Sequence, residues 1–324
     1  MTDAKGLASV SLDLDDLWSY LKVQGNPAWS ARPTYLGKFL PLALDALDAA
    51  GIRITFFIVG ADAARPEHRD VMPLITARGH EVGNHSFEHD SWLHTYTPEA
   101  LELEIVRAEE AIGEATGMRP LGFRGPGYSW TPGLLSLLAA RGYLYDASTL
   151  PTFIGPLARW YYFRTARLSA ADRQTRRLLF GRFRDGFRPL SAHLLRLTDT
   201  ASILEIPVTT MPLTRTPFHL SYLLYLSRVS RTAMRAYLRT ALALCARRGV
   251  EPSFLLHPLD LLGADDVADL SFFPGMDLPG ELKREIFSEV IGEIVARFRP
   301  VPMSEHARSL LRRGVPERRI GVVA

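Results

Sequence analysis

The sequence predicts an α/β fold in which a mainly parallel sheet closes, or nearly closes, into a barrel with helices outside. Short β-like runs alternate with amphipathic helical stretches in seven or eight successive units. Repeated strand–helix units are typical of parallel sheets covered by helices. Polar residues such as Asp13, His85 and His257 end predicted strands, which is where barrels of this kind carry their chemistry.

The first elements are predicted between residues 8 and 85. The strands are apolar or rich in β-branched and aromatic residues, and each of the two helices ends at a glycine, Gly51 or Gly79. We expect strands at 8–14, 53–59 and 81–85, and helices at 35–50 and 66–78.

The alternation continues through the middle of the chain. Thr97 is suited to cap a helix that runs to about Thr116, with Pro98 at its first position, and Thr131 with Pro132 begins another helix. We expect these helices at 97–116 and 131–141, and strands at 122–124 and 143–148.

The last third contains the remaining barrel elements and an insertion. We expect a helical insertion at about 155–198, a C-terminal tail from about 308 that is most simply a solvated end, strands at 203–208, 253–256 and 301–304, and helices at 220–248 and 279–298. The whole chain, 1–324, is predicted to be a single domain.

The composition is that of a folded protein. Apolar residues make up 47% of the 324 residues and charged residues 23%, which excludes a disordered chain. The single cysteine, Cys245, permits no intramolecular disulfide and is predicted to be a small core residue. No apolar segment follows a basic start, and no run of about 18 apolar residues occurs. We therefore expect no secretory signal, no membrane-spanning helix, and a cytoplasmic location.

Three carboxylates, Asp13, Asp15 and Asp16, close the first predicted strand. Such a group is costly at the end of an apolar strand unless it is paired, hydrogen-bonded or bound to a metal. Side chains alternate along a strand, so Asp13 and Asp15 face the same way. One of them is suited to bind a metal while the other acts as a base. The alternative is that one or two of the three cap the following helix.

Histidines follow the third predicted strand in the stretch GHEVGNHSFEH. His85 and His89 are four residues apart, which suits two imidazoles on one metal if a helical turn begins there. His80 precedes the strand and is expected at its opposite end, as a structural residue. A lone histidine is usually an ordinary core or surface residue, but a pair at this spacing together with the aspartates favours a metal. Two histidines and an aspartate would leave coordination positions open for substrate and water.

The stretch GHEVGNHSFEH resembles the second motif of NodB-like polysaccharide deacetylases, of the carbohydrate esterase 4 type, in which two histidines and an aspartate hold a divalent metal. The family's other motifs are matched in the same order, and the resemblance spans about residues 8 to 260. It implies a distorted (β/α)7-type barrel. The matching stretches are LDLDD ending at Asp16, FRGPGY from Phe123, YLYDASTLP from Tyr143 and FLLHP from Phe254.

The resemblance implies how the chemistry is divided. Asp15, His85 and His89 would bind the metal, most commonly zinc, with Co²⁺, Mn²⁺, Ni²⁺ or Fe²⁺ as alternatives. Asp13 would be the general base toward the attacking water, and His257 the general acid that protonates the leaving amine. The metal would lower the pKa of water and polarise the amide carbonyl.

Further residues take supporting roles by the same resemblance. Arg124 would orient Asp13 and stabilise its negative charge. The third and fourth motifs would line the substrate pocket, through Pro126, Tyr128, Asp146 and Ser148.

The chain departs from the family pattern in its first and fourth motifs. Many members have adjacent aspartates, whereas here both Asp13 with Asp15 and Asp15 with Asp16 are available as the base and ligand pair. We prefer Asp13 as base and Asp15 as ligand, which leaves Asp16 to cap a helix or to support the site. The fourth motif lacks a tryptophan that many extracellular members have, which disfavours a polymer platform. Asp260 either orients His257 or is a surface loop residue.

The insertion is strongly basic and aromatic. Between residues 157 and 197, ten arginines stand against two aspartates, a local excess of +8 in a chain whose net charge is +3. Arginine on an aromatic, apolar face is typical of a segment on an anionic membrane surface. One hypothesis is that the insertion docks the enzyme on the inner face of the membrane to reach a lipid-linked amino sugar. The alternative is a helical insertion whose aromatics pack on the barrel while solvated arginines face outward. The helix at 220–248 either extends this face or is an ordinary outer helix.

The leading hypothesis is an amide hydrolase that removes an N-acetyl group from an amino sugar, a glycolipid or small glycoside rather than an extracellular polymer. A second keeps the fold but assigns an N-formyl sugar or a non-sugar amide. A third is a non-catalytic sugar or lipid binder, which is disfavoured because the predicted ligands, base and acid are all present. No nucleic-acid recognition motif accompanies the charge, so no nucleic acid is expected as a partner. The sequence does not predict the oligomeric state.

Overall fold

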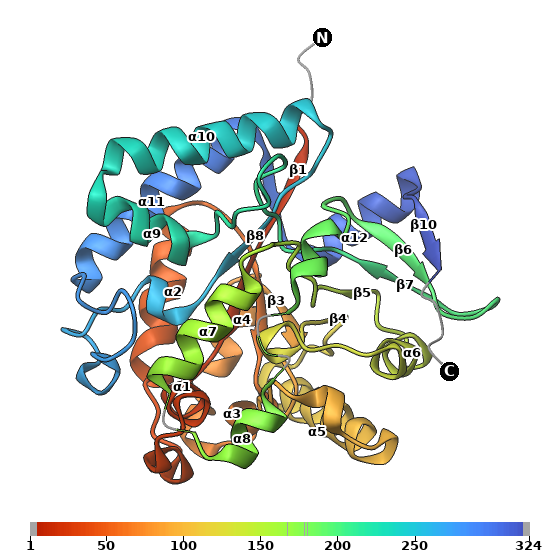
Figure 1. The fold of residues 1–324 in the computed structure, drawn as a ribbon, viewed down its shortest axis with the longest axis horizontal. Helices are drawn as coiled ribbons and strands as arrows, with labels where there is room; N and C mark the ends of the chain where they lie inside the picture. The colour runs from red at the N-terminus through yellow and green to blue at the C-terminus, as the bar shows by residue number, and fades with distance from the viewer. Residues whose placement is uncertain (1–4, 167, 178, 180, 320–324) are drawn as a thin grey trace.

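The computed structural model describes residues 5–166, 168–177, 179 and 181–319 (Figure 1). Arg167, Leu178 and Phe180 of the basic segment lie outside the described residues. Among the described residues, no helix combines the length and the apolar character needed to cross a bilayer.

Seven parallel strands stand side by side in the order β7, β5, β4, β3, β2, β1, β8. No ladder joins β7 to β8, but just past β7 the backbone of Thr209 donates to the carbonyl of Ser253 at 2.9 Å. The amide of Ser253 donates in return to the Thr209 hydroxyl at 2.8 Å. The α/β prediction of a distorted seven-stranded barrel is thereby confirmed. The strands are β1 (Leu7–Leu14), β2 (Thr55–Ile58), β3 (Glu81–Asn84), β4 (Gly122–Phe123), β5 (Tyr145–Asp146), β7 (Ser202–Glu205) and β8 (Ser253–Leu256).

Three further strands extend the sheet. β6 (His193–Arg196) runs antiparallel to β7, and β10 (Glu317–Arg319) pairs in parallel with β6. β9 (Arg299–Val301) pairs with the first residues of β1. The sequence did not predict β6 or β10. Both are short, β10 is exposed throughout and β6 is mostly of intermediate exposure, so neither shows the clear apolar alternation that predicts a strand.

Helices surround the barrel, as Figure 1 shows. The α-helices are α1 (Leu17–Gln24), α2 (Leu36–Ala49), α3 (Gly60–Ala63), α4 (Met72–Ala77), α5 (Pro98–Thr116), α6 (Pro132–Ala140), α7 (Gly155–Thr165), α8 (Ala170–Thr175), α9 (Leu220–Val229), α10 (Arg231–Arg247), α11 (Gly280–Arg297) and α12 (Met303–Arg313). Short 3₁₀ helices lie between them: η1 (Pro27–Ala31), η2 (Pro66–His68), η3 (Leu93–Thr95), η4 (Pro126–Tyr128), η5 (Phe183–Phe187), η6 (Pro258–Asp260) and η7 (Ala268–Leu270).

Most predicted helices are present, two of them are interrupted, and one predicted strand lies partly in a helix. The helix expected at 66–78 is divided into η2 and α4. The helix expected at 220–248 breaks at Ser230, whose backbone is extended and whose hydroxyl accepts from the amide of Ala233 to cap α10. Part of the strand expected at 301–304 is the start of α12, and the tail from residue 308 continues through α12 into β10.

The basic helix α10 is an outer barrel helix. Its arginines form ion pairs with the neighbouring helix α11: Arg235 lies 2.8 Å from Glu289 and Arg239 lies 2.6 Å from Glu293. Its other face buries Leu238, Leu242 and Cys245 in the core, which confirms the prediction for the cysteine. These two arginines of α10 are therefore neutralised within the protein.

Candidate metal centre and active site

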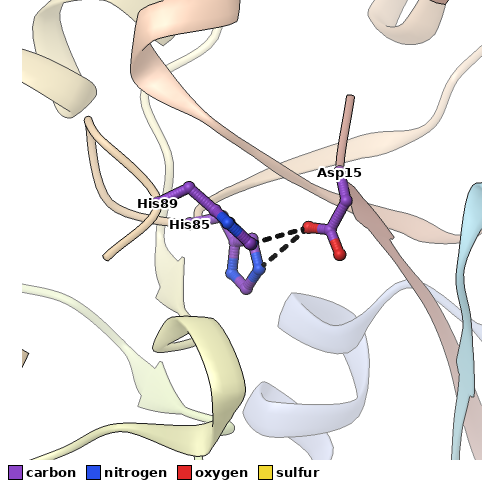
Figure 2. A group of neighbouring side chains, drawn as sticks. All are labelled: Asp15, His85 and His89. Atoms are coloured by element: carbon purple, nitrogen blue, oxygen red, sulfur yellow. Dashed lines mark ion pairs between the residues drawn. The ribbon is translucent and has the colours of Figure 1, made fainter. Parts of the chain in front are cut away.

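The carboxyl ends of the barrel strands bring the predicted metal ligands together. Asp15 follows β1, and His85 and His89 follow β3. Figure 2 shows both imidazole rings turned toward the Asp15 carboxylate. The Nε2 atoms of His89 and His85 lie 2.9 Å and 3.4 Å from Asp15 Oδ1, and all three side chains are buried.

The donor set fits a divalent metal. One oxygen and two nitrogens lie within 4.8 Å of one another. Asp15 Oδ1 is buried, yet it makes no hydrogen bond with any described residue. Burial by itself raises the pKa of Asp15, but His89 and His85 outweigh it and hold that pKa well below its usual value. A carboxylate and two imidazoles that converge without satisfying one another would all be satisfied by a cation between them, and zinc and related divalent ions take this donor set.

The loop that carries His89 is not the helical turn that the spacing suggested. Ser86 and His89 both have left-handed backbone conformations, with φ of 63° and 53°. The backbone amides of Phe87 and Glu88 donate to Glu104 Oε1 of α5, at 2.9 Å and 2.6 Å. The buried Glu104 carboxylate therefore replaces the missing helical hydrogen bonds and fixes the loop in a strained shape.

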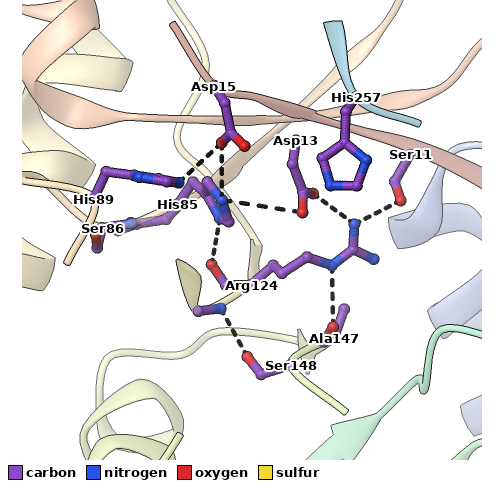
Figure 3. Close-up of polar contacts among 12 residues, drawn as sticks. Ser11, Asp13, Asp15, His85, Ser86, His89, Arg124, Ala147, Ser148 and His257 are labelled. Atoms are coloured by element: carbon purple, nitrogen blue, oxygen red, sulfur yellow. Dashed lines mark hydrogen bonds and ion pairs between the residues drawn. The ribbon is translucent and has the colours of Figure 1, made fainter. Parts of the chain in front are cut away.

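Arg124 organises the opposite side of the site, as Figure 3 shows. Its Nη1 donates to Asp13 Oδ1 at 2.7 Å and to Ser11 Oγ at 2.8 Å, and its Nε donates to the carbonyl of Ala147 at 3.0 Å. The guanidinium carbon lies 4.4 Å from the centre of the Phe57 ring. Arg124 is fully buried, so these contacts fix both its position and that of Asp13.

The turn after Arg124 depends on a glycine. Gly125 lies so close to the chain that follows it that an added Cβ would stand 1.9 Å from the carbonyl oxygen of Ser129. The predicted pocket residues Pro126 and Tyr128 are in this turn. Pro126 is buried, whereas Tyr128 is half-buried with φ of 61°. Burial, followed by the charge of Asp13, raises the pKa of Tyr128.

Asp146 and Ser148 lie beneath the site rather than on its surface. Both are fully buried. The Ser148 hydroxyl donates to Asp146 Oδ1 at 2.7 Å and accepts from the amide of Gly125 at 2.8 Å. Burial raises the pKa of Asp146 and that of Glu205, its register partner on β7. Asp146 and Ser148 were expected to line the pocket. They do not, because their polar atoms are buried and hold the Gly125 turn.

His257 follows β8 and faces the same centre. Its Nδ1 lies 3.8 Å from Asp260 Oδ2 and 3.5 Å from the Ser221 hydroxyl of α9. Burial lowers the pKa of His257, but the negative charges of Asp260, Asp13 and Asp15 outweigh it and raise the pKa to about 9. Asp260 is buried and also accepts from the amide of His257 at 2.8 Å. Asp260 therefore supports His257, and the surface-loop alternative is excluded.

Asp16 points away from the centre. Its Oδ1 accepts from the amide of Leu17 at 2.7 Å, which caps α1, and from the amide of Tyr35 at 3.0 Å. Asp16 is not in the cluster formed by Asp15, His85 and His89. His80 lies at the other end of β3, where its Nδ1 accepts from the amide of Ile54, as expected of a structural residue.

Three residues near the centre were not predicted from the sequence as part of the site. Glu104 is a charged residue on the buried face of α5, between Leu101 and Ile105. A charge among the apolar positions of an amphipathic helix is visible in the sequence and could have indicated its role. His219 precedes α9, and its ring centre lies 6.2 Å from that of His257. Tyr222 packs edge-on against His219 at 4.7 Å. No local motif marks the last two, because only the fold brings α9 to the end of β8.

Comparison with known proteins shows that the chain is similar to polysaccharide deacetylases. Residues 9–145 match the family of that name. The chain is 28% identical over 89 residues to the peptidoglycan-N-acetylglucosamine deacetylase of Bacillus cereus, covering 28% of this chain and 31% of that protein. It is 25% identical over 162 residues to the peptidoglycan deacetylase of Helicobacter pylori, covering 49% and 53%. The matches thus span between about a third and about half of these relatives.

A solved structure confirms the fold over the whole chain. A Mycobacterium smegmatis protein, crystallised as a candidate polysaccharide deacetylase, superposes with a TM-score of 0.59 at 18% identity. The superposition covers 100% of this chain and 96% of that one.

Proposed function

We propose, on the premise that the resemblance to polysaccharide deacetylases is confirmed over residues 9–145, that this protein is a metal-dependent hydrolase that removes an N-acetyl group from an amino sugar. The observation that supports this most is that a cluster of metal ligands lies next to a candidate base. Asp15, His85 and His89 form a metal-ligand cluster, and Asp13 stands beside it with its carboxylate fixed by Arg124. A Lewis acid next to an oriented base is what amide hydrolysis by water requires.

Asp15, His85 and His89 would hold the metal, with zinc the best candidate for a site of two imidazoles and one carboxylate. A divalent metal bound there would polarise the amide carbonyl and lower the pKa of water. His85 is already oriented for this role, because its Nδ1 donates to the carbonyl of Arg124 at 2.6 Å and leaves Nε2 free to face the centre.

Asp13 is proposed as the general base. Arg124 occupies its Oδ1, so Oδ2 remains to accept a proton from the attacking water, and Oδ2 lies 4.0 Å from His85 Nε2. Arg124 cannot take that proton itself, because a guanidinium stays charged at any relevant pH. It therefore serves to hold and to balance the base.

His257 is proposed as the general acid. With a pKa raised to about 9, its imidazole carries a proton at neutral pH, and it can give that proton to the leaving amine. Asp260 and Ser221 lie on its Nδ1 side, so the proton on Nε2 is the one available to the substrate. Tyr128 and Pro126 would form the adjacent wall of the pocket, while Asp146 and Ser148 would position that wall from behind.

We further propose that the amino sugar is small or lipid-linked rather than part of a polymer. The fourth motif lacks the tryptophan of many extracellular members. Exposed aromatic residues of α7 and α9 stand at the same side of the barrel as the site, since α9 packs against β8 and η6 and α7 is tied to α1. Such a surface suits a substrate that is carried in a membrane.

Acyl release by purified protein, with zinc or with a chelator, tests the proposal. The substrates would be a lipid extract and a soluble nucleotide-sugar pool, and mass spectrometry would identify each species that loses an acetyl or formyl group. We expect chelator-sensitive loss of acetyl from a lipid species, abolished by Asp13→Asn and by His257→Ala. Loss of formyl would replace the acetyl assignment. Loss from the soluble pool alone would exclude the lipid-linked substrate, and no loss from either pool, with metal bound, would refute the activity.

A further inference from the structure

Helix α7 presents an unpartnered aromatic face. Leu157, Trp160, Tyr161 and Arg164 follow the i, i+3, i+4, i+7 spacing of one helical face. Leu157 is 65% exposed, Trp160 56% and Tyr161 51%. This is unusual for side chains of that size, which the interior or an interface normally covers.

The orientation of α7 is fixed from its opposite face. Tyr162 is buried there, and its hydroxyl donates to the carbonyl of Val23 at 2.6 Å and accepts from Arg176 at 2.8 Å. Arg176 is itself buried and lies 4.6 Å from the ring centre of Trp92. These contacts hold α7 against the barrel, so the exposed face is a built feature of the fold. The packing alternative for the insertion thus describes Tyr162, but not the buried Arg176 or the exposed aromatics of the outer face.

Helix α9 continues the exposed face. Tyr222, Tyr225 and Val229 follow i, i+3, i+7 spacing and are all exposed. Burial, followed by the Tyr161 phenol of α7, raises the pKa of Tyr225. We call the surface formed by these residues the docking face. It consists of Leu157, Trp160, Tyr161, Tyr222, Tyr225 and Val229, together with Arg164.

The basic segment that begins with α7 carries several exposed arginines. Arg164 lies 5.1 Å from the ring centre of Trp160. Arg164, Arg177, Arg182 and Arg184 are exposed, and within the described part of the chain none of them forms an ion pair. Arg231, Arg235 and Arg239 of α10, by contrast, are paired with glutamates of α11. Cations that the protein leaves unpaired beside exposed aromatics complement an anionic surface.

Neighbouring aromatic side chains connect the docking face to the candidate active site. Tyr222 contacts His219, and His219 stands beside His257. A surface bound by α7 and α9 would thus lie at the rim from which His257 and Asp13 receive their substrate.

We propose that the docking face binds an anionic lipid bilayer, with its aromatic side chains at the level of the headgroups and its arginines on lipid phosphates. This inference rests on the proposed function, because it names the surface from which that site takes its substrate. Tryptophan, tyrosine and arginine on one helical face are typical of helices that lie in a membrane interface. Binding should weaken at high salt, because exposed charges are screened.

Flotation with vesicles tests the proposal without turnover, using the Asp13→Asn protein. We expect binding to vesicles of phosphatidylcholine with phosphatidylglycerol at low salt, and at least ten-fold weaker binding to phosphatidylcholine alone or at high salt. Leu157→Asp combined with Trp160→Ala should lower binding at least ten-fold, and Arg164→Glu should also lower it. Matched controls are Leu103→Asp, at a 56% exposed leucine of α5, and Arg247→Glu, at an exposed arginine of α10. Thermal unfolding would verify that each variant is folded.

Three results would overturn the docking face: protein that stays unbound at low salt, equal binding to neutral vesicles, or an equal loss of binding in the controls. The failure of the proposed function is distinguishable. Protein that binds anionic vesicles but releases no acyl group from any substrate would retain the docking face and lose the hydrolase. Protein that deacetylates a soluble amino sugar but binds no vesicle would do the reverse.

Discussion

The Nδ1 atom of His85 donates to the backbone carbonyl of Arg124 at 2.6 Å, while the side chain of the same arginine holds Asp13 at 2.7 Å. One residue therefore orients a candidate metal ligand through its backbone and the candidate base through its side chain. The two functions are separable by mutation, because a substitution removes the guanidinium and leaves the carbonyl in place.

Arg124→Lys should lower kcat by about 10²-fold or more while metal affinity changes little, because one ammonium cannot reproduce the contacts to Asp13, Ser11 and Ala147. Zinc titration and steady-state kinetics on the same preparation measure the two effects. A loss of zinc affinity as large as that of His85→Ala would show that the side chain, and not the carbonyl, orients the ligand.

Asparagine substitutions at the three aspartates should give three different results. Asp15→Asn should lose the metal, Asp13→Asn should keep it and lose activity, and Asp16→Asn should keep both, since asparagine is also a good helix cap. Asp16→Ala should cost about 1 kcal/mol of stability through the lost cap. Metal content by elemental analysis, activity and thermal unfolding decide among them. Retention of the metal by Asp15→Asn, with loss in Asp16→Asn, would favour the adjacent-aspartate pairing.

The contrast between these aspartates shows what the sequence could predict. Asp13, Asp15, His85, Arg124 and His257 were predictable because each sits at the end of a strand, in a short motif whose spacing is visible in the chain. The seven parallel strands were predictable from the same alternation of strands and helices.

Other features depend on contacts between distant segments. Glu104 reaches the ligand loop from α5, and His219 reaches His257 only because α9 packs on the end of β8. The left-handed backbone of His89 could not be predicted, since non-glycine residues adopt it only where surrounding contacts impose it. Asp146 and Ser148 stand in a matching motif, but their burial is decided by the packing around Gly125.

Glu104 is the most informative of the residues that the sequence did not reveal. Glu104→Ala should weaken zinc binding about 10- to 100-fold, because the amides of Phe87 and Glu88 lose their acceptor and the loop no longer presents His89. Glu104→Gln should restore most of the affinity, since its amide oxygen can accept the same bonds. Zinc competition against a chromophoric chelator measures both. Equal affinity in Glu104→Ala and the wild type would show that metal binding alone orders the loop.

The pH dependence of activity should identify His257 and its partner. A general acid must be protonated to act, so activity should fall as pH rises through the pKa of His257. That pKa is raised to about 9, above the value of a free imidazole. Asp260→Asn removes the nearest negative charge and should move this alkaline limb to lower pH. Profiles of kcat/KM for the two proteins test the shift. An alkaline limb that stays in place in Asp260→Asn would assign it to another group.

The Gly125 turn offers a test of how the pocket is held. Gly125→Ala would place a methyl group 1.9 Å from the Ser129 carbonyl oxygen, so the chain from Arg124 to Tyr128 must move. Because the amide of Gly125 also donates to Ser148, that movement would break the link to Asp146. We expect a loss of stability of about 1–3 kcal/mol from the strain, together with a higher KM. Gly113→Ala is the control, since an added Cβ there has no neighbour within 4 Å and alanine favours a helix. Chemical denaturation and substrate titration should show both effects in Gly125→Ala and neither in Gly113→Ala. An unchanged KM in a destabilised Gly125→Ala would show that the turn does not contribute to substrate binding.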